Sequence, residues 1–346
     1  MHILVIGGTR FMGPSVVRRL HEQGHSITVF HRGKTQAELP SGVQEILADR
    51  AHLFEFRNDF KHQAPDIVLD MIPFHEQDAQ LVMKTFHGIA QRVVALSSCD
   101  VYRAYGRTLG SEPGPSDPTP LTEAACLREK LYPYRGEKLR SEEDPMAWMD
   151  NYDKILIERV VMGSPDLSGT ILRLPMVYGP HDNMHRIFKY LQRMDEHRPV
   201  VVLGERFAHW LWTRDSVENV AAAIALAVTH PRAAGRIYNV GETQTLTIAE
   251  WVRAIGDAAE WNGTIITVPE EHLPTHLRSN IVTSQQMLID TTRIREELGY
   301  HPLVSQGDAL KQTVMWERAN PPDEIDMSDF DYEAEDTIVA KLQRNS

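Results

Sequence analysis

Short apolar runs alternate with helix-like stretches over the first hundred residues of the chain. Ile3–Ile6 is a continuous apolar run, which is typical of a parallel strand that is buried on both faces. The apolar side chains that follow recur at helical spacing: Met12, Val16, Val17 and Leu20. Further strand-like runs occupy residues 26–31, 66–71 and 92–97. This β-α-β-α-β order predicts an α/β fold built on a right-handed, doubly wound parallel sheet.

The stretch 103–149 breaks this rhythm, because it is rich in proline and glycine and has no regular period. A long excursion of this kind in a compact domain is typical of a functional lid, although an untethered surface loop has the same composition. Beyond it, the pattern predicts a helix over 217–228, a strand over 236–240 and a helix over 248–259.

The net charge of the chain limits the kinds of molecule that it can be expected to bind. The formal net charge is −12, and half of it lies in residues 320–346, where eight carboxylates stand against Lys341 and Arg344. Because phosphate contacts dominate nucleic-acid affinity, this excess of acid argues against DNA and RNA partners. No apolar run approaches the roughly 18 residues of a membrane span, and there are only two cysteines. We expect a cytoplasmic protein without a membrane partner, whose acidic tail is mobile or folds only against a partner.

A glycine-rich loop joins the first predicted strand to the first predicted helix. It reads Gly7, Gly8, Thr9, Arg10, Phe11, Met12 and Gly13. Glycines at this position let the backbone approach a pyrophosphate, and the helix N-terminus presents unpaired N–H groups to it. The loop therefore predicts a dinucleotide cofactor.

With this loop, several later segments resemble the extended short-chain dehydrogenase/reductase superfamily, whose members are NAD-dependent epimerase/dehydratase-like. The matching segments are Ser97–Tyr102, Leu172–Pro180, Trp212–Val220, Arg236–Gly241 and Asp290–Pro302. Arg10 stands where the superfamily has a middle glycine, and this departure is similar to the atypical GGTRF-type branch.

The resemblance implies a domain plan and several contacts. It implies a Rossmann domain over 1–180 with an excursion at 103–149, and a smaller substrate-binding α/β domain over 181–320. Residues 212–241 would return to the first domain, and 321–346 would form the acidic tail. It also implies cofactor contacts at Asp49, Arg50 and Pro175, and a homodimer through the helix that carries Lys154. On that helix Ile155, Leu156, Val160 and Val161 suit either the dimer interface or the core of the single chain.

The end of the second strand bears on the choice of nicotinamide cofactor. NAD-preferring proteins place a carboxylate there for the ribose 2′-hydroxyl, but this chain has Arg32 and no acid. A guanidinium can hold a 2′-phosphate, and Arg10 is in reach of the same group. NADP is therefore the expected cofactor, with NAD as the second choice.

The resemblance further implies Ser–Tyr–Lys catalysis, in which Tyr and Lys stand four apart on one helix and so share a face. Ser98 occupies the serine position and Lys154 the lysine position, but Asp150 stands in the tyrosine slot. An aspartate one turn from a lysine stays ionised, so Asp150 can be a weak base but not an acid. Tyr152, two residues from Lys154, would lie on the opposite face of a regular helix.

Three interpretations stay open at this point. Tyr134 and Lys138 form a complete Tyr-x-x-x-Lys, although Gly136 between them disfavours a helix. Alternatively, Lys154 works with Tyr134, which the excursion would deliver as the acid, its pKa lowered by the lysine. The third interpretation is that the usual chemistry has been lost.

Other side chains have two interpretations each. His181 and His185 have the spacing of a metal pair, but no third ligand follows from the sequence, and we assign no metal. His185, Arg186 and Lys189 fit an anionic substrate better, and Trp210 and Trp212 suit either a ligand or the core. We expect an NAD(P)-dependent oxidoreductase, epimerase or dehydratase that acts on a sugar or nucleotide-sugar-like alcohol. The alternative is a catalytically silent NADP-binding sensor or RNA-binding protein of the same fold.

Overall fold

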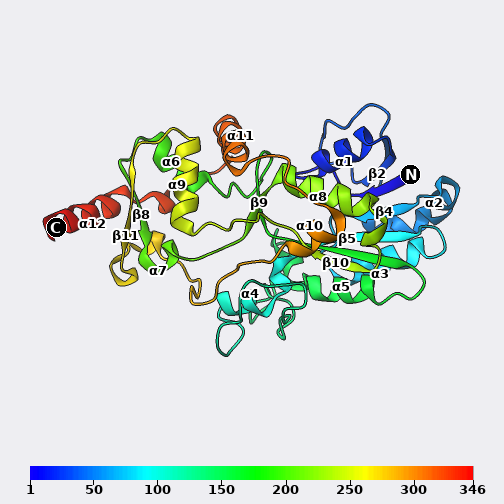
Figure 1. Ribbon diagram of the computed structural model, residues 1–346, viewed down its shortest axis with the longest axis horizontal. Coiled ribbons are helices and arrows are strands. Elements are labelled where there is room, and N and C mark those ends of the chain that lie inside the picture. Colours follow the sequence, from blue (N-terminus) through cyan, green and yellow to red (C-terminus); the bar gives the residue numbers. More distant parts are fainter. Residues whose placement is uncertain (346) are drawn as a thin grey trace.

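A seven-stranded parallel sheet forms the larger of two lobes in the computed structural model, which describes residues 1–345 (Figure 1). The strands are β1 (His2–Ile6), β2 (Ser26–His31), β3 (Gln44–Leu47), β4 (Ile67–Asp70), β5 (Arg92–Ser98), β6 (Ser168–Leu174) and β10 (Arg236–Asn239). Their order across the sheet is β3-β2-β1-β4-β5-β6-β10, and every pair is parallel. The predicted doubly wound α/β fold is confirmed.

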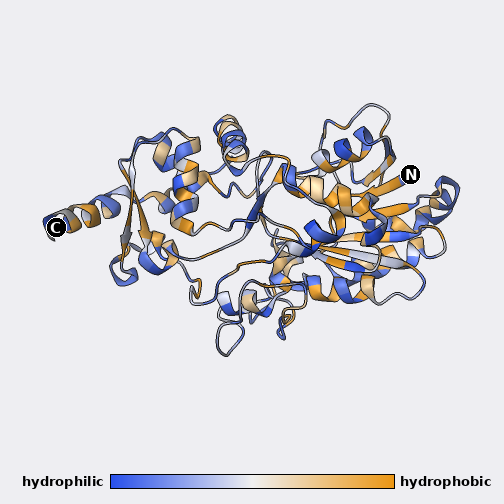
Figure 2. Ribbon diagram, viewed as in Figure 1, coloured by the Kyte–Doolittle hydropathy of each residue, from blue (hydrophilic) through white to orange (hydrophobic). Residues whose placement is uncertain are grey.

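Helices bury both faces of this sheet. Along β1, Ile3 and Val5 join one core cluster, and Leu4 and Ile6 join the other, as the alternation of side chains along a strand requires. The helices of the first face are α1 (Gly13–Glu22), α8 (Val217–Thr229) and α10 (Thr292–Leu298), and those of the second are α2 (Arg57–Gln63), α3 (Glu76–Phe86) and α5 (Lys154–Met162). Figure 2 shows the apolar character of β1 at the N-terminus.

The smaller lobe lies at the other end of the long axis (Figure 1). It contains a two-stranded sheet of β8 (Val200–Gly204) and β11 (Thr264–Val268), with α6 (Phe188–Asp195), α7 (Glu205–Ala208), α9 (Ile248–Ala258) and α11 (Gln306–Ala319). A second pair, β7 (Met176–Tyr178) and β9 (Arg214–Ser216), connects the lobes. Within residues 1–345, no helix has the length and apolarity to cross a membrane.

The excursion after β5 is tied to the body of the chain, although only α4 (Arg103–Thr108) and short 3-10 turns, the last over Ala147–Asn151, are regular. Buried carboxylates hold it: Asp117 pairs with Arg103 and Arg107, and Asp153 pairs with Arg128. Residues 134–138 are not helical, and Lys138 is exposed. The interpretation of Tyr134 and Lys138 as a helical pair is therefore wrong, and the glycine between them accounts for it.

The acidic tail also differs from expectation, because it folds against this chain itself. After a 3-10 turn at Met327–Phe330, α12 (Tyr332–Asn345) packs on the outer side of the smaller lobe. Ile338 and Val339 contact the cluster around Val202 and Val268. The net charge of the tail does not predict this contact, because the contact depends on a few apolar side chains on one side of α12.

Candidate active site

The glycine loop forms a tight cradle at the carboxyl end of β1. Gly7 and Gly8 have φ of +92° and +86°, a conformation that L side chains rarely adopt. A Cβ on Gly13 would lie 2.4 Å from the carbonyl carbon of Gly8. No side chain caps α1, so the cap position at the N-terminus of this helix is left open for a ligand. The cradle lies where the strand order reverses between β1 and β4, which is the usual dinucleotide site of such a sheet. These residues fit a pyrophosphate.

The other predicted cofactor residues differ in how exposed they are and in whether a neighbouring group holds their side chains. Arg32 is exposed, and Arg10 Nε donates to Thr35 Oγ1 at 2.7 Å. Asp49 is an N-cap whose carboxylate accepts from Ala51 N. The remaining predicted residues are all half-buried: Thr9, Phe11, Met12 and Pro175. Pro175 lies between β6 and β7.

Arg50 is held by the strand next to the cradle. Its guanidinium pairs with Asp70 at 3.0 Å and with Asp78 at 3.1 Å, and it donates to the carbonyl of Ile72. In this structure the side chain braces the end of β4, because two carboxylates and a carbonyl engage it.

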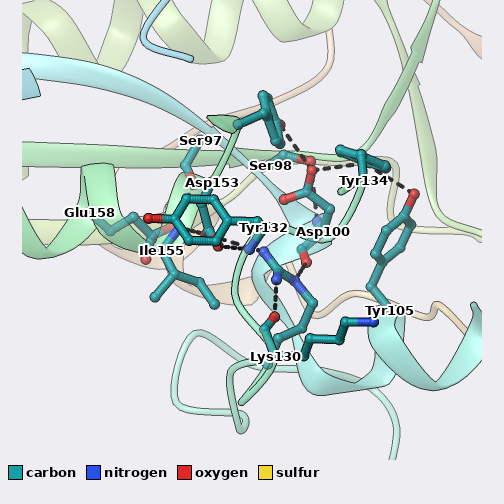
Figure 3. A network of polar contacts seen from close by, with 12 residues as sticks. Ser97, Ser98, Asp100, Tyr105, Lys130, Tyr132, Tyr134, Asp153, Ile155 and Glu158 are labelled. Atoms are coloured by element: carbon teal, nitrogen blue, oxygen red, sulfur yellow. Dashed lines mark hydrogen bonds and ion pairs between the residues drawn. The ribbon is translucent and has the colours of Figure 1, made fainter. Parts of the chain in front are cut away.

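A buried carboxylate that sequence reasoning left without a role forms the centre of the candidate site. Asp100 lies two residues beyond the end of β5, and its Oδ2 accepts from Tyr152 at 2.9 Å and from Tyr134 at 3.1 Å. Figure 3 shows Asp100 and Tyr134 of this network. Tyr105 extends the network, with its hydroxyl 3.2 Å from that of Tyr134. Asp100 Oδ1 is buried and has no hydrogen-bond partner in the described part of the chain. The signal in the sequence was its position just beyond a buried strand.

Burial governs the proton affinities of this cluster. It raises the pKa of Asp100, against the opposing charges of Arg128 and Lys154. Burial, followed by the nearby Asp100 charge, raises the pKa of Tyr134 and of Tyr152 well above the usual range. The lowered tyrosine pKa expected from the sequence is therefore not present. Both phenols stay protonated and donate to the carboxylate.

Lys154 opens α5 beside this cluster. Its buried ammonium donates to the carbonyl of Pro73 at 2.5 Å and to that of Leu96 at 3.0 Å. Burial lowers its pKa to about 8. The helix begins only after Asp153, the N-cap, so Tyr152 is not on a helical turn. The expectation that Tyr152 points away from the site is wrong for that reason.

The two other catalytic candidates have structural contacts. Asp150 is buried, accepts from Arg140 N at 2.7 Å and pairs with the Arg140 guanidinium, so it fastens the excursion. Ser98 Oγ accepts from Asp100 N at 3.1 Å and caps the short turn that presents Asp100. The structure thus brings together Ser98, Asp100, Tyr134 and Lys154, and it places Asp150 against Arg140.

A cavity of about 360 Å³ in the smaller lobe has a basic lining. Arg186, Lys189 and Trp212 line it, whereas Trp210 is buried and donates to the carbonyl of Gln285. Arg214 lines it as well, with a buried Nε that has no partner among residues 1–345, and burial lowers the Arg214 pKa to about 10.

The two histidines lie elsewhere. His185 faces Glu317 at 2.6 Å, and the His181 ring lies 5.5 Å from that of Trp316. The described chain has no group of three or more His, Cys, Asp or Glu side chains arranged to hold a metal.

A doubly wound sheet with a glycine cradle at its switch point defines a dinucleotide-binding protein of the Rossmann type. Residues 3–241 match the NAD dependent epimerase/dehydratase family, and the chain belongs to this family. It is 26% identical to a 2′-dehydrokanamycin reductase of Streptomyces kanamyceticus over 78% of this chain and 70% of that one. It is 24% identical to a UDP-N-acetyl-α-D-glucosaminuronate decarboxylase of Bacillus cytotoxicus over 91% and 97%. Its fold resembles that of a Bordetella bronchiseptica enzyme in complex with NAD and UDP, with a TM-score of 0.66 and 16% identity over 92% and 94%.

Proposed function

We propose that this chain is an NAD(P)-dependent oxidoreductase, epimerase or dehydratase that acts on a hydroxyl group of a nucleotide sugar. The observation that carries the proposal is the buried cluster of Asp100, Tyr134, Tyr152 and Lys154 at the sheet edge that also holds the glycine cradle. Membership of the family supports it.

The proposed chemistry assigns a task to each group. A bound nicotinamide supplies hydride transfer. Asp100 Oδ1, the oxygen without a partner, takes the proton of the substrate hydroxyl, while the two phenols donate to Oδ2 and stabilise the carboxylate. Lys154 supplies a positive charge that acts on Asp100, and its proposed second task is a hydrogen bond to the nicotinamide ribose.

The substrate proposal rests on the basic cavity of the smaller lobe. Lys189, Arg214 and Arg278 line it, and none of them has a carboxylate at ion-pair distance within residues 1–345. Such a lining suits a diphosphate, and the half-buried Trp212 offers a ring for a base or a sugar. The UDP-sugar relative and the fold neighbour with bound UDP agree with this choice.

The experiment that tests the function follows the fluorescence of the bound nicotinamide. The protein, loaded with NAD⁺ or NADP⁺, receives UDP-glucose, UDP-glucuronate, dTDP-glucose or free glucose. We expect a nucleotide sugar to reduce the bound cofactor, whereas glucose leaves it oxidised. An unchanged signal with every sugar, in protein that demonstrably holds the cofactor, would favour a silent binder.

NADP is our proposed cofactor, and Arg32 carries the preference. A charge-assisted hydrogen bond contributes about 1.5–3 kcal/mol, so Arg32→Asp should weaken NADP binding about tenfold or more. NAD affinity should change little, because NAD has no 2′-phosphate. Isothermal titration with both nucleotides measures this. Arg18→Asp, the same charge change at another exposed site, is the control. Equal losses for the two nucleotides, or an unchanged preference, would reject the assignment.

We also propose a homodimer through α5. Within the single chain, Ile155 and Val161 are buried in the core, whereas Leu156 and Val160 are only half-buried. The latter two are the side chains that a partner subunit would cover.

A further inference from the structure

The C-terminal tail reaches the basic cavity of the smaller lobe and places a buried carboxylate behind its wall. Glu335 of α12 is 1% exposed. Its Oε1 lies 2.6 Å from Arg193 Nη2 and 3.0 Å from His276 Nε2, and both of these residues line the cavity. Asp329, from the turn before α12, lines the cavity too and accepts from Arg193 through its carbonyl. The tail is therefore part of the cavity wall.

Several contacts fix the tail in this place. Phe330 is buried, with its ring 6.3 Å from that of Phe188 and 4.9 Å from the Arg193 guanidinium carbon. Further along α12, Asp336 pairs with Arg198, and the apolar side chains pack on β8 and β11. Because Glu335 is fully engaged and the helix is anchored on both sides of it, the tail is a fixed wall and not a flap.

The tail changes the charge that the cavity offers to a ligand. Six cationic or titratable basic side chains line it: Arg186, Lys189, Arg193, Arg214, His276 and Arg278. Asp182 pairs with Arg186, and Glu335 occupies both Arg193 and His276. Three cations, Lys189, Arg214 and Arg278, are then left for a ligand in the described chain, against the single lining carboxylate of Asp329. The resulting excess of two positive charges suits a diphosphate diester.

We infer that Glu335 is a specificity-determining residue, which limits the negative charge that the cavity accepts. By pairing with Arg193 and engaging His276 from within the protein, it selects a diphosphate diester over a more highly charged anion such as a triphosphate or free pyrophosphate. A buried ion pair that loses one partner leaves the other charge unpaired, so the cavity would become more positive without Glu335. This inference rests on the proposed function only for the identity of the natural ligand.

The test compares Glu335→Gln with Glu333→Gln, which removes the same charge from an exposed site on the same helix. The full-length variants are titrated calorimetrically with inorganic pyrophosphate, UTP and UDP-glucose. We expect Glu335→Gln to bind pyrophosphate and UTP about tenfold more tightly than wild type, with a smaller gain for UDP-glucose. Glu333→Gln should behave like wild type.

A second variant moves the charge in the opposite direction and keeps the test decisive if Glu335→Gln does not fold. Arg193→Gln leaves the tail carboxylate in the wall, and all three anions should bind about tenfold more weakly. Equal affinities in wild type and both wall variants would overturn the inference. So would a loss of affinity for every anion in Glu335→Gln, which would indicate a purely structural tail. If wild type does not bind UDP-glucose, the proposed function fails, and the pyrophosphate series still decides the role of Glu335.

Discussion

Asp100→Asn is expected to lower turnover about 100-fold or more, the contribution of a general acid or base, and to leave NAD(P) affinity unchanged. An amide keeps the shape of the side chain and can accept from Tyr134 and Tyr152, but it cannot take a proton from a substrate hydroxyl. Steady-state kinetics with the nucleotide sugar that reduces the cofactor, together with cofactor titration, measures the two effects separately. Wild-type turnover in this variant would contradict the assignment of Asp100 as the base.

The same geometry predicts different effects on turnover for substitutions of the tyrosines in this network. Tyr134→Phe removes a donor from the Asp100 carboxylate and is expected to lower turnover at least about 100-fold, with NADP affinity nearly unchanged. Tyr105→Phe is the matched control, because the Tyr105 hydroxyl contacts that of Tyr134 at 3.2 Å and, within residues 1–345, reaches Asp100 only through it. Its effect should be much smaller. Equal effects of the two substitutions would indicate that the network only supports the fold.

Asp150→Asn completes this series, because Asp150 was the other acidic candidate. In the structure the Asp150 carboxylate pairs with the Arg140 guanidinium and accepts from Arg140 N. The substitution should therefore loosen the excursion and lower the melting temperature more than it lowers turnover. Thermal unfolding and kinetics on the same preparation separate the two. If Tyr134→Phe and Asp150→Asn both turn over like wild type, the silent-binder interpretation becomes the better one.

The part of the fold that the sequence predicts well depends on local patterns of apolar residues and glycines. The runs that became β1, β2, β4 and β5 are apolar because both faces of the sheet are covered, and the glycine loop needs its residues for reasons of backbone geometry. Both kinds of signal lie within a few neighbouring residues, so they can be recognised without any tertiary contact.

The features that the sequence concealed depend on contacts between distant segments. Tyr134 and Tyr152 reach Asp100 across 34 and 52 residues, and Glu335 reaches Arg193 across 142. Tyr152 precedes Asp153, the N-cap of α5, so helical spacing relative to Lys154 does not determine where its side chain points. In the tail, the carboxylates dominated the charge count, although one of them is the buried partner of two basic side chains.

Lys154→Met is expected to lower turnover by at least about 100-fold and to weaken NAD(P) binding, because it removes the positive charge that we propose hydrogen-bonds the nicotinamide ribose. The folded protein should keep its stability. Burial lowers the pKa of Lys154 from 10.5 to about 8, which costs the charged form about 3 kcal/mol. Relief of that cost offsets the two hydrogen bonds to Pro73 and Leu96, at about 1 kcal/mol each.

The lowered pKa of Lys154 also fixes the direction of the pH dependence. The ammonium form is present below about pH 8 and is lost as the pH rises through that value, so kcat/KM should fall on the alkaline side. Between about pH 8 and 10.5 the unfolded chain binds this proton and the folded chain does not, so the contribution of Lys154 to stability rises with pH there. In Lys154→Met that rise should disappear, because the group that titrates is gone. An alkaline fall in activity that persists in the residual turnover of Lys154→Met would assign the titration to another group. Stability that drops sharply in this variant would make Lys154 a structural residue first.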